Sequence, residues 1–113
     1  MIVLRAPTQV WSGRDGDLGE ASIHGIYHGD VRHVRAVTLT YDGHAPEPIS
    51  VSAHGASRVT FGSLLRRADD SSADPKVRLL RERQVTDGTV VESLTVRSHL
   101  DTAFRIVLRL RIE

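Results

Sequence analysis

The feature that most constrains the fold of this chain is the recurrence of apolar residues at every second position over most of its length. In the last segment, apolar side chains at positions 104, 106, 108, 110 and 112 alternate with residues that are mostly arginine. Successive side chains of a β-strand point to opposite faces, so this spacing gives one apolar and one largely basic face. A helix would scatter the same residues around its axis. The pattern predicts a strand from Phe104 to Ile112.

The segment from Lys76 to Ser98 is predicted to form a β-hairpin, because Asp87-Gly88 supplies a two-residue turn in which positive φ costs little. Counting outward from the turn gives four facing pairs on one, mostly apolar face: Val85 with Val90, Arg83 with Glu92, Arg81 with Leu94, and Leu79 with Val96. Arg83 and Glu92 would form a cross-strand ion pair flanked by valines. Such a pair contributes about 0.2–1 kcal/mol if partly exposed and is costly to break if buried.

Three other segments have the character of strands, at 23–28, 34–41 and 57–65. The inward faces of the last two are predicted to hold Val37, Leu39 and Tyr41 in one strand and Val59, Phe61, Ser63 and Leu65 in the other. Six or more short strands without a convincing helix predict an all-β fold, an antiparallel β-sandwich of about seven to nine strands.

Turns and irregular segments separate the strands. Asp42-Gly43 is a second tight-turn signal, and Pro46 and Pro48 after it cannot donate backbone hydrogen bonds. The returning arm is therefore expected at a sheet edge or outside the sheet. Segments 12–20 and 68–75 are rich in glycine or polar residues and are predicted to be irregular.

Length and composition exclude several classes of protein. The 113 residues are predicted to form a single domain, 1–113, and 40% hydrophobic residues suffice for a core. A net charge of +1 provides no strong attraction for nucleic acid or anionic lipid. The absence of cysteine excludes disulfides, thiolate zinc sites and a cysteine nucleophile. The N-terminus lacks the apolar stretch of a signal peptide or membrane span, so a cytoplasmic location is expected.

Three histidines, His24, His28 and His33, lie close enough in sequence to suggest a metal site. Gly25 and Gly29 disfavour the helix that would align the first two histidines, and no acidic or cysteine partner lies at a zinc-like spacing. Histidines in loops and at strand ends are therefore the preferred interpretation, and no metal ligand is predicted.

Other candidate sites each lack a required part. Asp69, Asp70 and Asp74 lack the glycine and closing glutamate of a calcium loop, so a solvated turn is predicted. The spaced glycines of segment 12–20 have no strand before them and no helix after them to bind phosphate. No G-x-S-x-G elbow presents a serine nucleophile. Neither a cofactor nor a catalytic residue is predicted.

Two groups of side chains suggest binding. Arg105, Arg109 and Arg111 form a basic stripe, but aromatic residues make up only 4% of the chain, and single-strand binders depend on aromatic stacking. A solvated or interdomain face is therefore preferred over nucleic-acid binding. Trp11 and Tyr27 lie in segments that look irregular enough to present them to sugar rings, although a core or interface position is the simpler interpretation.

Short segments in a fixed order carry a resemblance to a known family: Asp15-Gly16-Asp17, Gly25-Ile26-Tyr27, Asp30 and Arg32, 39–43, 46–48, Arg81-Glu82-Arg83, Asp87-Gly88, 92–97 and the closing strand. On these residues, the stretch from Asp15 to Arg111 resembles the N-terminal domain of bacterial glycogen debranching enzymes of the amylo-α-1,6-glucosidase type. The chain departs from the family pattern at 27–32, where an arginine and a threonine are missing, and at Ser98, where asparagine is usual.

The resemblance implies a noncatalytic, β-rich module that packs on a helical toroid carrying the catalytic acids of a glycosidase. On this first hypothesis the partner is the toroid, which is absent from this chain, and the domain supports or shapes its active site. Asp30 and Arg32, with Arg83 and Glu92, are predicted to anchor the structure, the first two at the domain contact.

The alternative is a free-standing carbohydrate-binding or self-associating β-sandwich, in which Trp11 and Tyr27 stack on an α-glucan. Because the strand at the C-terminal end leaves an open edge, homo-oligomers are expected. A small hydrolase acting alone is a third, remote hypothesis. Neither nucleic acid nor membrane is predicted as a partner.

Overall fold

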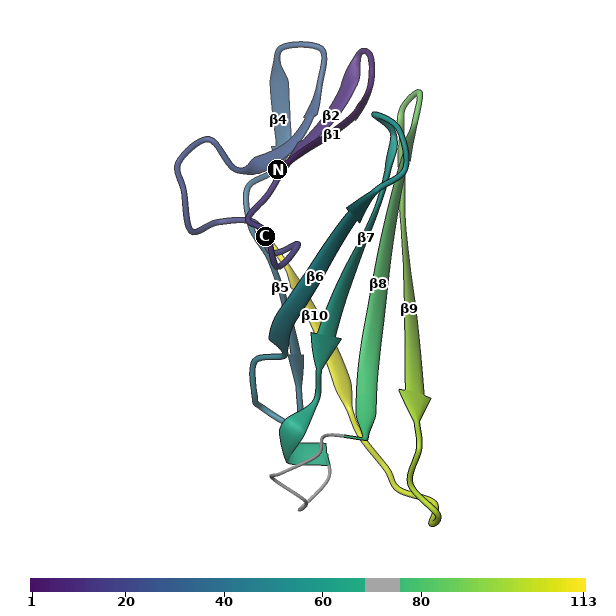
Figure 1. Ribbon diagram of the computed structural model, residues 1–113. Helices are drawn as coiled ribbons and strands as arrows, with labels where there is room; N and C mark the ends of the chain where they lie inside the picture. Colours follow the sequence, from purple (N-terminus) through teal and green to yellow (C-terminus); the bar gives the residue numbers. More distant parts are fainter. Residues whose placement is uncertain (69–75) are drawn as a thin grey trace.

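The computed structural model describes residues 1–68 and 76–113, and these residues form an all-β fold (Figure 1). Asp69, Asp70 and Asp74, with nearly all of the predicted polar loop, lie outside the described residues. The helical structure of the described residues is one 3₁₀ turn, Arg66–Ala68. No helix of residues 1–68 or 76–113 is long and apolar enough to cross a membrane.

The described residues form ten strands in three antiparallel sheets. The N-terminal sheet contains, in spatial order, β1 (Ile2–Arg5), β2 (Thr8–Trp11), β3 (Gly25–His28) and β4 (Val31–Val34). The long sheet contains β6 (Glu47–Ala53), β7 (Arg58–Leu64), β8 (Val77–Thr86) and β9 (Thr89–Ser98). The two-stranded sheet pairs β5 (Val37–Tyr41) with β10 (Leu108–Ile112).

The two smaller sheets cover the inner face of the long sheet, so the molecule has the two layers of a sandwich (Figure 1). One core cluster lies toward the β8–β9 turn and contains Val3, Val10, Leu18, Val37, Val59, Phe61 and Val85. A second cluster lies toward the other end and contains Leu39, Tyr41, Leu65, Val77 and Leu79. The predicted antiparallel β-sandwich is confirmed.

The β8–β9 hairpin has the predicted register. Gly88 in its turn has a φ of +76°, and the four predicted cross-strand pairs are the observed ones. On β8, the inward residues from Val77 to Val85 are buried. Each strand of the hairpin has ten residues, so its inner face is long. Two smaller sheets, placed one after the other along that length, are needed to cover it.

The predicted alternation is found in β5 and β7. In β4 only Val34 belongs to a predicted strand, and its first three residues are all exposed. The 34–41 segment is divided between β4 and β5, and the intervening Arg35 and Ala36 both donate their N–H groups to the carbonyl of Glu113. The predicted inward faces of β5 and β7 are buried. The arm with Pro46 and Pro48 leads into β6, which is an edge strand of the long sheet as predicted.

Two expectations are corrected. The closing strand begins at Leu108 rather than Phe104, because its partner β5 has only five residues and ends at Tyr41. Beyond that point, Val107 donates its N–H to the side chain of Asp42 and accepts the Asp42 N–H. Strands β1 and β2 were not predicted, because each has only four residues and contributes a single buried hydrophobic side chain, Val3 or Val10.

Candidate functional site

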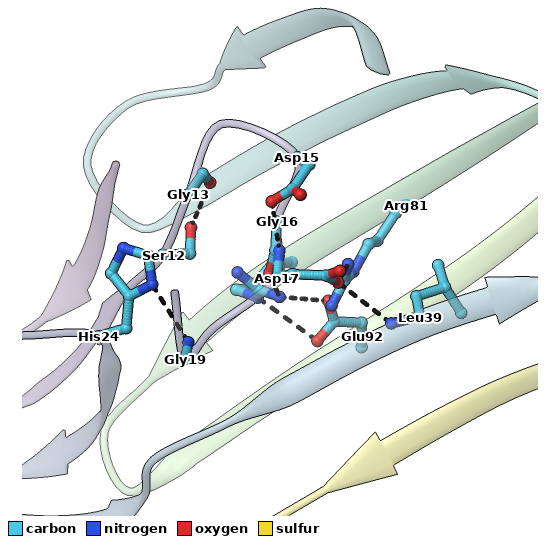
Figure 2. Close-up of polar contacts among 11 residues, drawn as sticks. Ser12, Gly13, Asp15, Gly16, Asp17, Gly19, His24, Leu39, Arg81 and Glu92 are labelled. Atoms are coloured by element: carbon cyan, nitrogen blue, oxygen red, sulfur yellow. Dashed lines mark hydrogen bonds and ion pairs between the residues drawn. The ribbon is translucent and has the colours of Figure 1, made fainter. Parts of the chain in front are cut away.

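The loop between β2 and β3 lies against the inner face of the long sheet and makes polar contacts with it (Figure 2). Asp15 accepts the N–H of Asp17 through its side chain at 2.9 Å, and Gly13 donates its N–H to the Asp17 carbonyl at 2.9 Å. Gly16 has a φ of +91°, and a Cβ there would lie 2.9 Å from the Phe61 ring. The sequence needs glycine at this position, both for the backbone conformation and for the close approach to the sheet.

The carboxylates of Asp17 and Glu92 and the guanidinium groups of Arg81 and Arg83 form one connected set of ion pairs, here called the arginine network. Arg81 donates to Asp17 at 2.7 Å and to Glu92 at 2.6 Å. Arg83 donates to Glu92 at 2.6 Å and to the carbonyl of Gly16 at 2.7 Å. The network therefore ties the β2–β3 loop to both strands of the hairpin (Figure 2).

Burial determines the electrostatics of this network. The exposed fractions are 2% for Arg81 and 1% for Arg83, and the Arg83 guanidinium lies 5.3 Å from the centre of the Phe61 ring. Burial lowers the pKa of Arg83, and the charge and hydrogen bonds of Glu92 offset part of this shift. Burial also raises the pKa of Asp17 above its ordinary value, an effect that its hydrogen bond and ion pair with Arg81 only partly counteract.

The network leaves some donors unmatched by protein atoms. Arg81 Nη2 and Arg83 Nη1 are buried and have no hydrogen-bond partner within residues 1–68 and 76–113. Arg81 also lines a cavity of about 40 Å³, whose walls include both polar residues, such as Asp17 and Ser63, and apolar residues, such as Leu39 and Leu79. A cavity of this size accommodates a water molecule but not a sugar ring. The network is thus built to hold the fold and offers little room for a substrate.

The predicted pair of Arg83 and Glu92 is present, but the sequence interpretation missed two members of the network, Asp17 and Arg81. Arg81 could have been identified, because the predicted register placed it on the inner face beside Arg83. Two buried cations on one face require more than one carboxylate partner. Asp17 had no comparable signal. Its contact with Arg81 spans 64 residues of sequence and depends on the path of the loop.

The predicted stacking residues, Trp11 and Tyr27, come together on the outer face of the N-terminal sheet, which is the face directed away from the core. They line an open hollow of about 330 Å³, here called the Trp11 hollow, with Gln9, Ile23, Gly29 and Asp30. Both aromatic side chains are half-buried. Trp11 ends β2, so the expectation that it lies in an irregular segment is wrong, whereas Tyr27 is in β3, within the strand predicted at 23–28.

Asp30 and Arg32, predicted as structural anchors, make separate contacts and form no ion pair with each other among the described residues. Arg32 donates to the carbonyls of Ser22 at 2.9 Å and His24 at 3.3 Å, which fixes the loop before β3. Asp30 is exposed at the rim of the Trp11 hollow. Their predicted place at a domain contact stays a prediction.

The three histidines have separate environments. His24 is buried, and its Nδ1 accepts the N–H groups of Gly19 at 3.2 Å and Ala21 at 3.4 Å. His28 shares a hydrogen bond with Thr8 at 3.0 Å, and His33 is exposed on β4. Over residues 1–68 and 76–113, no three histidine or acidic side chains gather as a metal site would require.

Comparison with known proteins agrees with this architecture. Residues 3–113 match the model of a family described as the N-terminal domain of some glycogen debranching enzymes. No curated protein and no solved structure matches the chain. Because the family model spans nearly the whole chain, from β1 to the end of β10, the chain belongs to the family of N-terminal domains found in some glycogen debranching enzymes.

Proposed function

We propose that this domain is a noncatalytic module that packs against the helical catalytic domain of a debranching-type glycosidase and shapes part of its active-site cleft. Family membership supports the general role of an N-terminal domain in such enzymes. The observation that carries the noncatalytic part of the proposal is the commitment of the interior carboxylates to arginine. Asp17 and Glu92 each accept hydrogen bonds from buried guanidinium groups.

Glycoside hydrolysis normally requires two carboxyl groups facing a sugar, one able to donate a proton and the other free to act as a base or nucleophile. Both carboxylates of the arginine network already accept hydrogen bonds from buried guanidinium groups, and the cavity that Asp17 lines has room for water alone. The arginine network therefore favours a structural role, and the reaction is assigned to the partner domain.

For the docking face we propose the outer face of the two-stranded sheet. Arg109 and Arg111 project there from β10 and are exposed, with Thr40 and Thr38 as their register partners on β5. The predicted Arg105 of the same stripe is exposed as well. On a chain of net charge +1, this local excess of positive charge fits an acidic surface on the partner.

The experiment is to mix the chain with a separately produced helical catalytic domain of a debranching-type glycosidase from the same genome. Calorimetric titration should give a one-to-one complex, and glucose release from a branched glucan should change on addition of the chain. The double variant Arg109→Glu/Arg111→Glu should weaken the complex at least tenfold. Arg78→Glu/Arg97→Glu is the matched control, because it makes the same charge change on exposed residues of β8 and β9.

Two results would contradict this proposal. A chain that forms no complex with the catalytic domain does not act as its accessory module. A chain that releases glucose from branched glucan by itself, with the release abolished by Asp17→Asn, carries catalytic machinery of its own.

Self-association is a second candidate function, favoured by the edges of the sheets. Strand β9 is an edge strand of ten residues, and its Val91 and Leu94 are 50% and 36% exposed. Strand β10 pairs only with β5 among the described strands. Unpaired edges of this kind can add a strand from a second copy. Sedimentation velocity tests this candidate, and a monomer at all concentrations up to about 100 μM would eliminate it.

A further inference from the structure

The Trp11 hollow lies on the one face of the N-terminal sheet that does not contribute to the core. The strand register sets this arrangement, because Gln9 faces Tyr27 and Trp11 faces Gly25 across β2 and β3, while Val10 between them is buried on the opposite face. Gln9 and the two aromatic residues of the hollow therefore lie on regular strands, which hold side chains in place more firmly than loops do, whereas Ile23, Gly29 and Asp30 lie in the turns that flank β3.

Both aromatic rings are fixed by a hydrogen bond at their polar ends. Trp11 Nε1 donates to Oε1 of Gln9 at 3.0 Å, and the Tyr27 hydroxyl donates to the carbonyl of Ile23 at 2.8 Å. Rings that are already ordered lose little conformational entropy when a ligand binds. Such a pair of rings is preorganised for stacking.

The wall of the hollow at Ile23 is braced from behind by Arg32. Arg32 donates to the carbonyls on either side of Ile23, those of Ser22 and His24. It reaches them by lying across Gly25, where an added Cβ would meet the Arg32 side chain at 2.5 Å. Glycine at 25 thus lets a long side chain fix the position of the Ile23 wall and, through its carbonyl, of the Tyr27 hydroxyl.

The polar groups of the hollow suit hydroxyl-rich, uncharged ligands. The Asp30 carboxylate is exposed and has no hydrogen-bond partner among the described residues, so it can accept hydrogen bonds from hydroxyls. The Gln9 amide contributes donors, and its oxygen already holds Trp11. A carboxylate at the rim disfavours anions, and aromatic rings beside a carboxylate match the apolar face and hydroxyl edge of a pyranose.

We propose that the Trp11 hollow is a binding subsite for a pyranose residue of an α-glucan. Its volume of about 330 Å³ is at the lower end of the range for ligand sites, about 300–1,000 Å³, which fits one or two sugar rings. The sugar site rests on the geometry of the hollow, and the identification of the sugar as α-glucan rests on the proposed function.

The test is a titration of the 113-residue chain with maltoheptaose, followed by the fluorescence of Trp11, the only tryptophan of the chain. A saturable change is expected, and cellohexaose should bind at least fivefold more weakly. Tyr27→Ala and Asp30→Asn should each weaken binding fivefold or more. Asp87→Asn, at the exposed β8–β9 turn, is the matched control for Asp30→Asn and should leave binding unchanged.

Each outcome decides a separate point. The absence of a saturable signal overturns the sugar site, whether or not the chain docks on a catalytic domain. Equal binding of maltoheptaose and cellohexaose overturns the assignment to α-glucans. Binding that survives both Tyr27→Ala and Asp30→Asn overturns the proposed location of the sugar site.

Far-UV circular dichroism shows whether a variant folds. Tyr27→Phe provides a milder change, because it removes only the hydroxyl that anchors the ring, and it should weaken binding about two- to threefold.

Discussion

The arginine network, on the inner face of the long sheet, and the Trp11 hollow, on the outer face of the N-terminal sheet, differ in what their polar groups contact. In the arginine network, each charged side chain is bound to another part of the same chain, and Arg81 and Arg83 are almost completely buried. In the Trp11 hollow, hydrogen bonds fix the aromatic rings, but Asp30 is left exposed without a partner among the described residues.

This difference separates groups that maintain the fold from groups available to a ligand. A buried cation must be paired, so the arginines use up the nearby carboxylates. A half-buried aromatic on an outer sheet face has no such requirement, and its ring can contact a partner. Substitutions in the network should therefore change stability, whereas substitutions at the hollow should change binding.

The largest effect is expected for Glu92→Ala. The substitution leaves Arg83 without its carboxylate partner and Arg81 with Asp17 alone, both deep in the interior. Breaking a buried ion pair from one side costs about 3–5 kcal/mol. Urea unfolding should therefore show a decrease of this size in the free energy of unfolding.

Glu82→Ala provides the control for Glu92→Ala. Glu82 is the acidic residue of β8, lies beside its register partner Ser93 on the sheet face away from the network, and makes no ion pair among the described residues. Its removal should change stability by about 0.5 kcal/mol or less. Equal effects of the two substitutions would show that the network does not stabilise the fold.

The next largest effect is expected for Gly16→Ala, in the loop that the network holds. The new Cβ would adopt a φ of +91° and would lie 2.9 Å from Phe61 and 3.1 Å from Arg81 Nη1. The backbone conformation costs about 1–2 kcal/mol, and overpacking adds about 1–3 kcal/mol. Thermal unfolding should show the combined loss.

Gly43→Ala separates the two contributions to the Gly16 effect. Gly43 has a φ of +79°, and an added Cβ would meet nothing within 4 Å. Only the backbone cost of about 1–2 kcal/mol should appear. If Gly43→Ala is as destabilising as Gly16→Ala, the close packing of the β2–β3 loop on Phe61 has no energetic consequence.

Local patterns were sufficient to predict the strands that carry the arginine network. The Asp87-Gly88 turn fixed the register of β8 and β9, and with it the pairing of Arg83 with Glu92. The alternation in β5 and β7 identified their buried faces. These features depend on residues within about ten positions of each other, where strand geometry alone decides which side chains meet.

Long-range features could not be obtained from the same patterns. The contact between Asp17 and Arg81 depends on the path of an irregular loop, and β1 and β2 are too short to show an alternation. Trp11 and Tyr27 were selected for their residue types, but their shared face follows from the pairing of β2 with β3. That pairing needs knowledge of the whole sheet.

A smaller effect, visible in its pH dependence, is expected for Asp17→Asn. Burial raises the native pKa of Asp17, so the native state binds this proton more tightly than the unfolded state does. The contribution of Asp17 to stability therefore falls as the pH rises through the native pKa. Asparagine keeps the acceptor oxygen for Arg81 and for the Leu39 N–H but does not titrate.

The measurement for Asp17→Asn is the free energy of unfolding of the variant minus that of the wild type between pH 3 and pH 8. This difference should increase with pH above the ordinary carboxyl range and then level off. A difference that instead decreases with rising pH would mean that the ion pair with Arg81 outweighs the cost of burying the carboxylate.

The smallest effect on stability is expected for Asp30→Ala, and it gives the sharpest test of the comparison between the two regions. Asp30 is exposed, and no ion pair or hydrogen bond holds its side chain among the described residues, so the free energy of unfolding should change by about 0.5 kcal/mol or less. Maltoheptaose binding should nevertheless weaken, because the carboxylate is the free acceptor of the hollow. Glu92→Ala, studied under conditions where it remains folded, should show the reverse pattern, with lower stability and unchanged sugar affinity. If Asp30→Ala lowers stability as much as it lowers affinity, the hollow belongs to the structural part of the molecule, and the division between the two faces fails.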